Sequence, residues 1–173
     1  MTELVTRRMT PDDAELIREQ RERMFAEAGI AGDSLEAMRE PFVHWVRPRL
    51  ANGTYLGWAV MQDDAAVAGL GLLVLDWPPH PQHPLDCRRG YVLNVYVGPE
   101  ARGRGLAKGL MAVAEAECRT LGIEYMVLHA SPLGRPVYQG LGWKATNEMS
   151  ISLSGLAPTA ADAPLVADAP PGV

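Results

Sequence analysis

A strand that runs directly into a glycine-rich bend and a helix is the feature that most limits the fold of this chain. Residues 91–97, Tyr-Val-Leu-Asn-Val-Tyr-Val, are the β-branched and aromatic types that favour a strand. A short turn over 98–101 leads to Arg-Gly-Arg-Gly-Leu-Ala at 102–107, where an amphipathic helix begins. The pattern predicts a strand and a helix joined by a tight corner.

This corner predicts an anion site. The first N–H groups of a helix have no intrahelical acceptor, and the helix dipole adds partial positive charge there. Gly103 and Gly105 carry no Cβ that would keep an anion away, and Arg102 and Arg104 add charge. Because such corners bind phosphate, we expect a phosphorylated ligand.

Length and charge narrow the class of protein. The chain has 173 residues, 47% hydrophobic and 21% charged, which suits one globular domain with a real core. No apolar run approaches the roughly 20 residues that cross a bilayer, and the first residues lack a signal-peptide pattern. A net charge of -5 argues against nonspecific nucleic-acid or membrane partners. Cys87 and Cys118 lack C-x-x-C spacing, which fits a cytoplasmic location.

Periodicity and turn residues predict the elements before the corner. They are a strand at 3–9, helices at 10–28 and 33–52, and a hairpin with strands at 54–61 and 65–75. Pro41 and Pro48 lie inside the second helical pattern and predict a kink or two short helices.

The elements around and after the corner follow from the same signals. They are a loop at 77–89, a helix at 104–121, a strand at 125–130, a short helix at 134–140 and a last strand at 144–153. Alanine and proline dominate the end of the chain with little apolar pattern. We therefore predict one domain over 1–153 and a disordered tail over 154–173.

Two motifs in this order resemble the GNAT superfamily of acyl-CoA-dependent N-acyltransferases. The first is the R-x-x-G-x-G/A signature, matched by Arg102, Gly105 and Ala107. The second is the Tyr-x-x-x-Gly-aromatic element, matched by Tyr-Gln-Gly-Leu-Gly-Trp at 138–143, with tryptophan in the last place. One helix and one strand separate the motifs, as in the family, and the resemblance covers 1–153 in element order.

The resemblance implies an α/β (α+β) domain of the acyl-CoA N-acyltransferase fold. Its central sheet would be mixed and mostly antiparallel, with helices on both faces and a V-shaped splay between strands 91–97 and 125–130. The strand 91–97 would separate from its neighbour after residue 97 and expose main-chain groups to a bound ligand.

The family's ligand, acetyl-CoA, is the implied co-substrate, and no metal is implied. The diphosphate would lie on the N–H groups of 102–107, and the pantetheine arm would run along the strand 91–97. The implied CoA-binding residues are Val95, Tyr96, Val97, Arg102, Gly103, Arg104, Gly105, Leu106, Ala107, Lys108, Ser131 and Tyr138.

The resemblance also assigns the chemistry. The Val95 N–H would stabilise the thioester oxygen as charge develops, an effect of roughly 3 kcal/mol. Tyr138 would protonate the departing thiolate, at a cost of roughly 2 kcal/mol for a thiol pKa near 8.5 and a phenol near 10. A neutral amine would attack directly, through a tetrahedral intermediate and without an acyl-enzyme. Ser131 departs from the family, which often has an asparagine touching the pantetheine.

The glycines, Tyr138 and the histidines of the loop also have other interpretations. The glycines also match a loose dinucleotide pattern, but that pattern belongs after a first strand, and the G-K-[ST] ending of a P-loop is missing. Tyr138 outside its motif would be read as a packed aromatic residue. His80, His83, Asp86 and Cys87 match no common zinc spacing, so we predict no metal and expect their loop to line the acceptor pocket.

The sequence leaves the general base and the acceptor open. Asn94 and Tyr96 share one strand face, and Tyr91 and His129 lie at the ends of neighbouring strands. Asn94, Tyr91 and His129 are the candidates for acceptor binding, and a water relay could replace a side-chain base. The acceptor is expected to be a primary amine on a small molecule or peptide, and the acidity of the chain favours a small amine or basic side chain over an acidic substrate.

Two alternatives to an acetyltransferase stay open. One is a non-catalytic sensor that binds acyl-CoA, and the other is an N-acyltransferase that uses a longer acyl-CoA. Tyr138 favours an enzyme, because a sensor needs no proton donor at the sulfur. The sequence also leaves the oligomeric state open, with a homodimer as one option.

Overall fold

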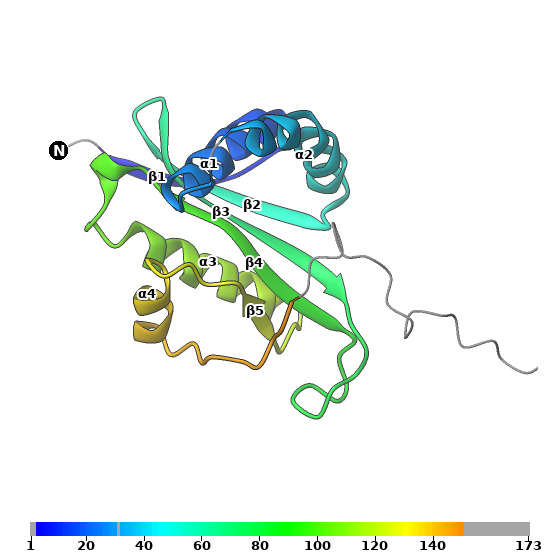
Figure 1. Cartoon of the computed structure of the whole chain (residues 1–173). Helices are drawn as coiled ribbons and strands as arrows, with labels where there is room; N and C mark the ends of the chain where they lie inside the picture. Colours follow the sequence, from blue (N-terminus) through cyan, green and yellow to red (C-terminus); the bar gives the residue numbers. More distant parts are fainter. Residues whose placement is uncertain (1–2, 31, 151–173) are drawn as a thin grey trace, which may run out of the picture. The chain divides into compact units, whose positions relative to one another are not determined.

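The computed structural model describes residues 3–30 and 32–150, which form a central sheet with helices on its two faces (Figure 1). The sheet has five strands in the order β1-β2-β3-β4-β5. The strands β1 to β4 pair antiparallel in sequence order, and β5 pairs parallel to β4. The predicted mixed, mostly antiparallel sheet is confirmed. The chain divides into two units after Trp143, and the first unit holds all of these elements.

The first strand and the first two helices follow the predicted boundaries closely. β1 is Leu4–Arg8, and a short 3-10 turn at Pro11–Asp13 leads into α1, Ala14–Glu27. The Thr10 N–H donates to the Asp13 carboxylate at 2.7 Å, which satisfies one of the free donors at the start of the turn.

The second helix, α2, is continuous from Asp33 to Asn52 and contains both prolines. The expectation of two short helices is therefore wrong. Pro41 and Pro48 are seven residues apart on one exposed face, where their rings meet solvent, while Phe42, Val43 and Val46 bury the opposite side. Burial of that apolar side holds the helix together in spite of the missing N–H donors.

The hairpin and the corner are also as predicted. β2 is Tyr55–Gln62 and β3 is Ala65–Asp76, with Asp63 in the left-handed region of the turn. β4 is Arg88–Val97, a 3-10 turn covers Pro99–Ala101, and α3 is Leu106–Thr120. β4 thus takes in the last two residues of the predicted loop, because Arg88 and Arg89 pair with the end of β3.

The last elements of the first unit are short. β5 is Met126–Leu128 and α4 is Arg135–Gly140. The predicted strand at 144–153 is wrong over its described part, because residues 144–150 are exposed and join no strand. An exposed, mostly polar segment buries no side chains, so nothing favours pairing with the sheet. Residues 151–153 and the predicted tail at 154–173 lie outside the described residues.

The core consists of two apolar clusters, one on each face of the sheet. Side chains of α1 and α2 pack on one face, and α3 packs on the other (Figure 1). Among the largest fully buried side chains are Ile17, Val46 and Tyr55 in the first cluster and Leu70, Leu72, Leu110 and Met111 in the second. Among the described residues, no helix has the length and apolar character needed to cross a membrane.

Tyr55 packs its hydroxyl against Gly71 on the neighbouring strand β3. An ideal Cβ on Gly71 would lie 2.0 Å from the Tyr55 hydroxyl oxygen, far inside van der Waals contact. Tyr55 is 1% exposed and cannot swing into solvent. The space above Gly71 is therefore required by the fold.

We expect Gly71→Ala to destabilise the protein by about 1–3 kcal/mol, because the added methyl overpacks a rigid core site. Chemical denaturation measures the change. Gly109→Ala is the matched control, since Gly109 lies within α3 and a Cβ there meets no described atom within 4 Å. The control should gain about 0.5–1 kcal/mol from helix propensity. Equal stability of Gly71→Ala and wild type would contradict the packing argument.

Candidate active site

Strand β4 contains a β-bulge that the sequence analysis did not predict. Leu93 pairs with Gly71 and Tyr96 pairs with Gly69, so that Asn94 and Val95 together face the single residue between those glycines on β3. The backbone of Asn94 has φ 53°, in the left-handed region, which asparagine tolerates better than most residues. The bulge turns Leu93 and Asn94 toward the same face of the sheet, the one covered by α1 and α2.

The side chain of Asn94 holds the bulge through two hydrogen bonds, one buried and one partly buried. Its amide nitrogen donates to the Tyr55 hydroxyl at 3.0 Å, and its amide oxygen accepts from Nη1 of Arg21 on α1 at 2.6 Å. Asn94 is 5% exposed, and burial raises the pKa of Tyr55 to about 12. Both ends of the amide are thus satisfied inside the core, as a buried polar group requires.

The far edge of β4 opens at the same place. β5 pairs with β4 only over Gly90, Tyr91 and Val92. Beyond Val92, no strand of the described residues pairs with that edge of β4. The predicted splay is confirmed, but it begins after Val92 rather than after residue 97, because β5 is only three residues long. Val95 is therefore part of the bulge that faces β3, and on its other side the edge of β4 is open.

The glycine-rich bend presents a row of N–H groups. Gly103 and Gly105 have φ values of 74° and 78°, which a residue with a Cβ adopts only with strain. Gly105 is the N-cap of α3, and the first helical hydrogen bond runs from the Gly109 N–H to the Gly105 carbonyl at 3.0 Å. Within the described chain, the N–H groups of 103–108 have no acceptor. This arrangement is suited to bind an anion.

The two arginines of the bend contact other parts of the structure. Arg102 donates from Nε to the Val97 carbonyl at 3.0 Å and from Nη2 to the Glu27 carboxylate at 2.5 Å. Arg104 donates to the Gln62 side chain at 2.7 Å. The bend is thereby fastened to the end of β4 and to α1. Part of the charge of Arg102 is balanced by Glu27, whereas Lys108 is exposed at the first turn of α3.

Tyr138 lies on α4 in a compact turn built by the second motif. The Trp143 N–H donates to the Tyr138 carbonyl at 3.0 Å, and the two rings are 6.4 Å apart. Gly142, with φ 88°, allows the chain to make this turn. The ring of Tyr138 packs close to Gly134, and burial raises the pKa of its hydroxyl above the ordinary value. Tyr138 therefore holds its proton at neutral pH.

Ser131 and the pair of Tyr91 and His129 complete the predicted set. The Ser131 hydroxyl accepts the Gly134 N–H at 3.1 Å, so it stabilises the start of α4. The Tyr91 hydroxyl is hydrogen-bonded to Nδ1 of His129, which joins β4 to the segment after β5. His129 is exposed and Tyr91 is half-buried. The structure thus brings these two candidates together, while it buries Asn94 away from solvent.

In the loop at 77–89, the ring nitrogens of the buried histidine find hydrogen-bond partners within the protein. His83 is fully buried, accepts from Nε of Arg89 at 3.1 Å and lies 3.0 Å through Nδ1 from the Asp86 carbonyl. Because Nε2 accepts, the proton lies on Nδ1, which donates to that carbonyl. No group of three or more potential metal ligands occurs in residues 3–30 and 32–150. That this loop lines an acceptor pocket stays a prediction.

Comparison with known proteins identifies the family. Residues 15–143 match the family model described as Acetyltransferase (GNAT) family. The chain belongs to this family. It is an acyltransferase with the acyl-CoA N-acyltransferase fold, as the motifs at 102–107 and 138–143 indicated. A search of curated proteins returned no match.

Solved structures agree with this assignment. A GCN5-related N-acetyltransferase from Ralstonia eutropha JMP134 is 48% identical with a TM-score of 0.85, over 88% of this chain and 100% of that chain. A predicted acetyltransferase with acetyl-CoA from Clostridium acetobutylicum is 27% identical with a TM-score of 0.81, over 87% and 97%. The aminoglycoside N-acetyltransferase AAC(6')-Iy in complex with CoA is 18% identical with a TM-score of 0.69, over 90% and 97%, which shows a shared fold alone.

Tyr55 should make the stability of this GNAT protein depend on pH at the alkaline end. Its folded pKa of about 12 exceeds the ordinary value of 10.0, so the folded state keeps a proton that the unfolded state loses. The stabilisation is fully present below about pH 10, and the free energy of unfolding falls by roughly 1.4 kcal/mol per pH unit between about pH 10 and about pH 12. Tyr55→Phe should remove this part of the slope, measured by chemical denaturation across that range.

Tyr125→Phe is the control for this measurement, because Tyr125 stacks on His83 and has no contact with Asn94 within the described structure. The control should keep the wild-type slope. If wild type and Tyr55→Phe lose stability equally with rising pH, the buried hydroxyl is not the titrating group.

Proposed function

We propose that this chain transfers an acetyl group from acetyl-CoA to a primary amine. One observation carries the proposal: β4 opens and bulges at Val95, and the same strand leads into a bend with unpaired N–H groups at 103–108. A ligand with a diphosphate at one end and a thioester at the other matches these two features. The Clostridium acetobutylicum relative was crystallised with acetyl-CoA, which supports this choice of donor.

In the proposed binding mode, the diphosphate lies on the N–H groups of 103–108, with Arg104 and Lys108 nearby. The Arg102 N–H already donates to the Pro99 carbonyl at 3.4 Å, so it contributes less than the others. The pantetheine arm would extend along Val97 and Tyr96 on the open edge of β4, bonding to main-chain groups as an added strand does. Ser131 would lie beside the arm and could still donate its hydroxyl proton.

The proposed chemistry needs two groups of the protein. The amine nitrogen attacks the thioester carbon, and the Val95 N–H stabilises the oxygen on which negative charge develops. The C–S bond then breaks, and the Tyr138 hydroxyl gives its proton to the sulfur of the leaving thiolate. The nitrogen loses its extra proton to water, or to the pair of Tyr91 and His129. The raised pKa of Tyr138 keeps this donor protonated before the reaction.

The acceptor is an amine on a small molecule or peptide, and the location is the cytoplasm. A homodimer, a longer acyl donor and a non-catalytic sensor are the variants that experiments would separate. Release of thiol from acetyl-CoA in the presence of an amine panel is the first measurement, because a sensor binds acetyl-CoA without consuming it.

Tyr138→Phe should lower kcat by roughly 10²–10⁴-fold, the usual contribution of a general acid, because the thiolate would leave without a proton. Affinity for acetyl-CoA should change by less than about twofold, since the ring and its packing are retained. Stopped thiol-release assays give kcat, and calorimetry gives the affinity.

Tyr125→Phe again serves as the control, because it removes a phenol hydroxyl from the residue just before β5. This variant should keep the wild-type kcat. An unchanged kcat in Tyr138→Phe would remove this residue from the mechanism. Tight acetyl-CoA binding without thiol release for any amine would favour the sensor.

Gly105→Ala should weaken acetyl-CoA binding by about tenfold. The Cβ opposes the left-handed φ of 78° at this position, so the N–H groups of the bend lose their common direction. Acetyl-pantetheine, which lacks the diphosphate, should bind wild type and variant equally well. Gly109→Ala, four residues further along, should bind both donors as wild type does. A loss that is equal for acetyl-CoA and acetyl-pantetheine would contradict a diphosphate site here.

A further inference from the structure

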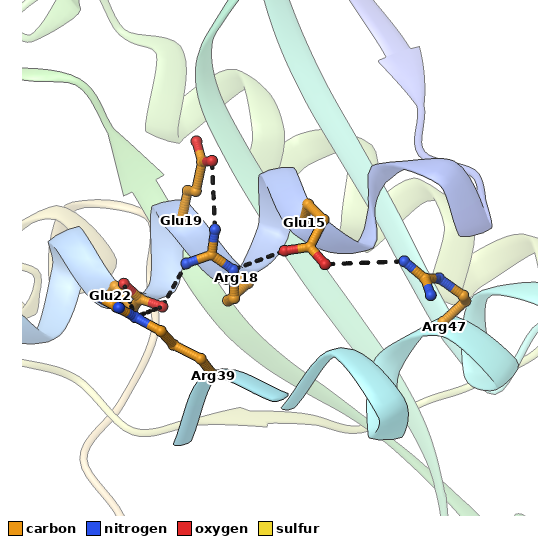
Figure 2. Close-up of polar contacts among 6 residues, drawn as sticks. All are labelled: Glu15, Arg18, Glu19, Glu22, Arg39 and Arg47. Carbon is orange, nitrogen blue, oxygen red and sulfur yellow. Dashed lines mark hydrogen bonds and ion pairs between the residues drawn. The ribbon is translucent and has the colours of Figure 1, made fainter. Parts of the chain in front are cut away.

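Two arginines one turn apart on α1 differ in their partners. Arg18 is held by three carboxylates, those of Glu15 at 2.8 Å, Glu22 at 2.6 Å and Glu19 at 3.4 Å (Figure 2). Glu22 also pairs with Arg39 of α2 at 3.1 Å. The charges along this side of α1 are therefore balanced within the chain.

Arg21 has no such balance. In the part of the chain that the structure describes, no carboxylate pairs with it. Nη1 donates to Asn94, Nε is buried without an acceptor, and no described residue accepts a hydrogen bond from Nη2. The guanidinium lies over the rings of Phe25 and Phe42, at 4.6 Å and 5.0 Å from their centroids. Burial lowers the pKa of Arg21, yet a guanidinium stays charged at neutral pH.

An unpaired, partly buried cation is costly, so its surroundings invite an anion. Contact with the aromatic rings compensates for only part of the hydration free energy that the guanidinium loses on burial. No described carboxylate supplies the anion, since Glu22, which follows directly in sequence, is already bound to Arg18 and Arg39. A bound ligand with an anionic group would supply it.

The position of Arg21 indicates which ligand this is. Its hydrogen bond to Asn94 places the guanidinium at the bulge, one residue before Val95. Arg21 lies on the face covered by α1 and α2, whereas Val95, Tyr138 and α3 belong to the core on the opposite face. The proposed CoA groups occupy that opposite face and the edge of β4. In this arrangement the second substrate would approach from the side on which Arg21 lies.

We propose that Arg21 binds an anionic group of the acceptor, and that the acceptor is an amine that also carries a carboxylate. This inference rests on the proposed acetyl transfer. A carboxylate carries one charge and can accept from Nη2, which suits a single free guanidinium. One guanidinium would balance only half the charge of a phosphate dianion, and the neighbouring Arg18 is already engaged. The net charge of the chain predicted a substrate that is not acidic. The unpaired guanidinium of Arg21 indicates the opposite, an acceptor with an acidic group.

The test compares amino acids with their own amides as acceptors. Glycine, alanine, leucine and γ-aminobutyrate are each paired with the corresponding amide, and phosphoethanolamine is paired with ethanolamine. Thiol release from acetyl-CoA gives kcat/KM for every compound. The α-amino acid amides have the lower amine pKa and more neutral amine near pH 7, so the comparison is biased against the predicted preference.

We expect at least one acid to exceed its amide by tenfold or more in kcat/KM. Arg21→Gln should bring that ratio close to one, and Arg21→Lys should restore part of it by restoring the charge. Arg23→Gln is the matched control, because Arg23 is exposed on the same helix and should keep the wild-type ratio. Each ratio is measured within one protein sample, so a smaller folded fraction in a variant cancels.

The outcomes separate this inference from the proposed function. Amides used as well as acids, or an acid preference that survives Arg21→Gln, would overturn the role of Arg21 and leave acetyl transfer intact. A preference for phosphoethanolamine alone would replace the carboxylate by phosphate and also overturn the proposal. If no amine releases thiol, acetyl transfer fails, and calorimetry with N-acetylglycine and N-acetylglycinamide on the CoA-saturated protein decides about Arg21. Equal binding of the two would overturn it.

Discussion

The buried amide of Asn94 is the interaction on which the site depends. It keeps a non-glycine residue at a φ of 53° by bonding to Arg21 on one side and Tyr55 on the other. Without both bonds, the amide would be a polar group left unsatisfied in the core, and a regular strand would be the better conformation for the same residues. The bulge at Val95 is therefore fixed by side chains on the sheet face that α1 and α2 cover, and not by the residues of β4 alone.

The bulge and the glycine bend are coupled by direct contacts. Arg102 bonds to the Val97 carbonyl and to Glu27, so the start of α3 cannot shift along β4 without breaking an ion pair to α1. This contact sets the separation between the N–H groups at 103–108 and the open edge of the strand. A ligand that spans both features meets a site whose two ends are already positioned, which limits the entropy lost on binding.

Local signals predicted most elements, while features that depend on distant partners were missed. The hairpin, the glycine bend and the end of α1 depend on neighbouring residues, and all three were predicted. The bulge was missed because Val-Leu-Asn-Val-Tyr contains no local signal for one, and its partners lie 39 and 73 residues away. For the same reason, nothing in the sequence distinguished Arg21 from its neighbours on α1. The continuous helix through Pro41 and Pro48 likewise follows from tertiary burial that overrides local propensity.

Different groups are available to a ligand on the two sides of β4. On the α3 side, free N–H groups and Lys108 suit the diphosphate of a donor. On the α1 side, the guanidinium of Arg21 is hydrogen-bonded to the same Asn94 amide that shapes the bulge. An anion that binds to Arg21 would therefore also affect Asn94, the residue next to Val95. An anion bound there would neutralise a cation whose other anchor is Asn94. Under the proposed roles of Arg21 and Val95, acceptor binding and the geometry of the strand would share one hydrogen bond, which would link the choice of acceptor to the position of the reacting carbonyl.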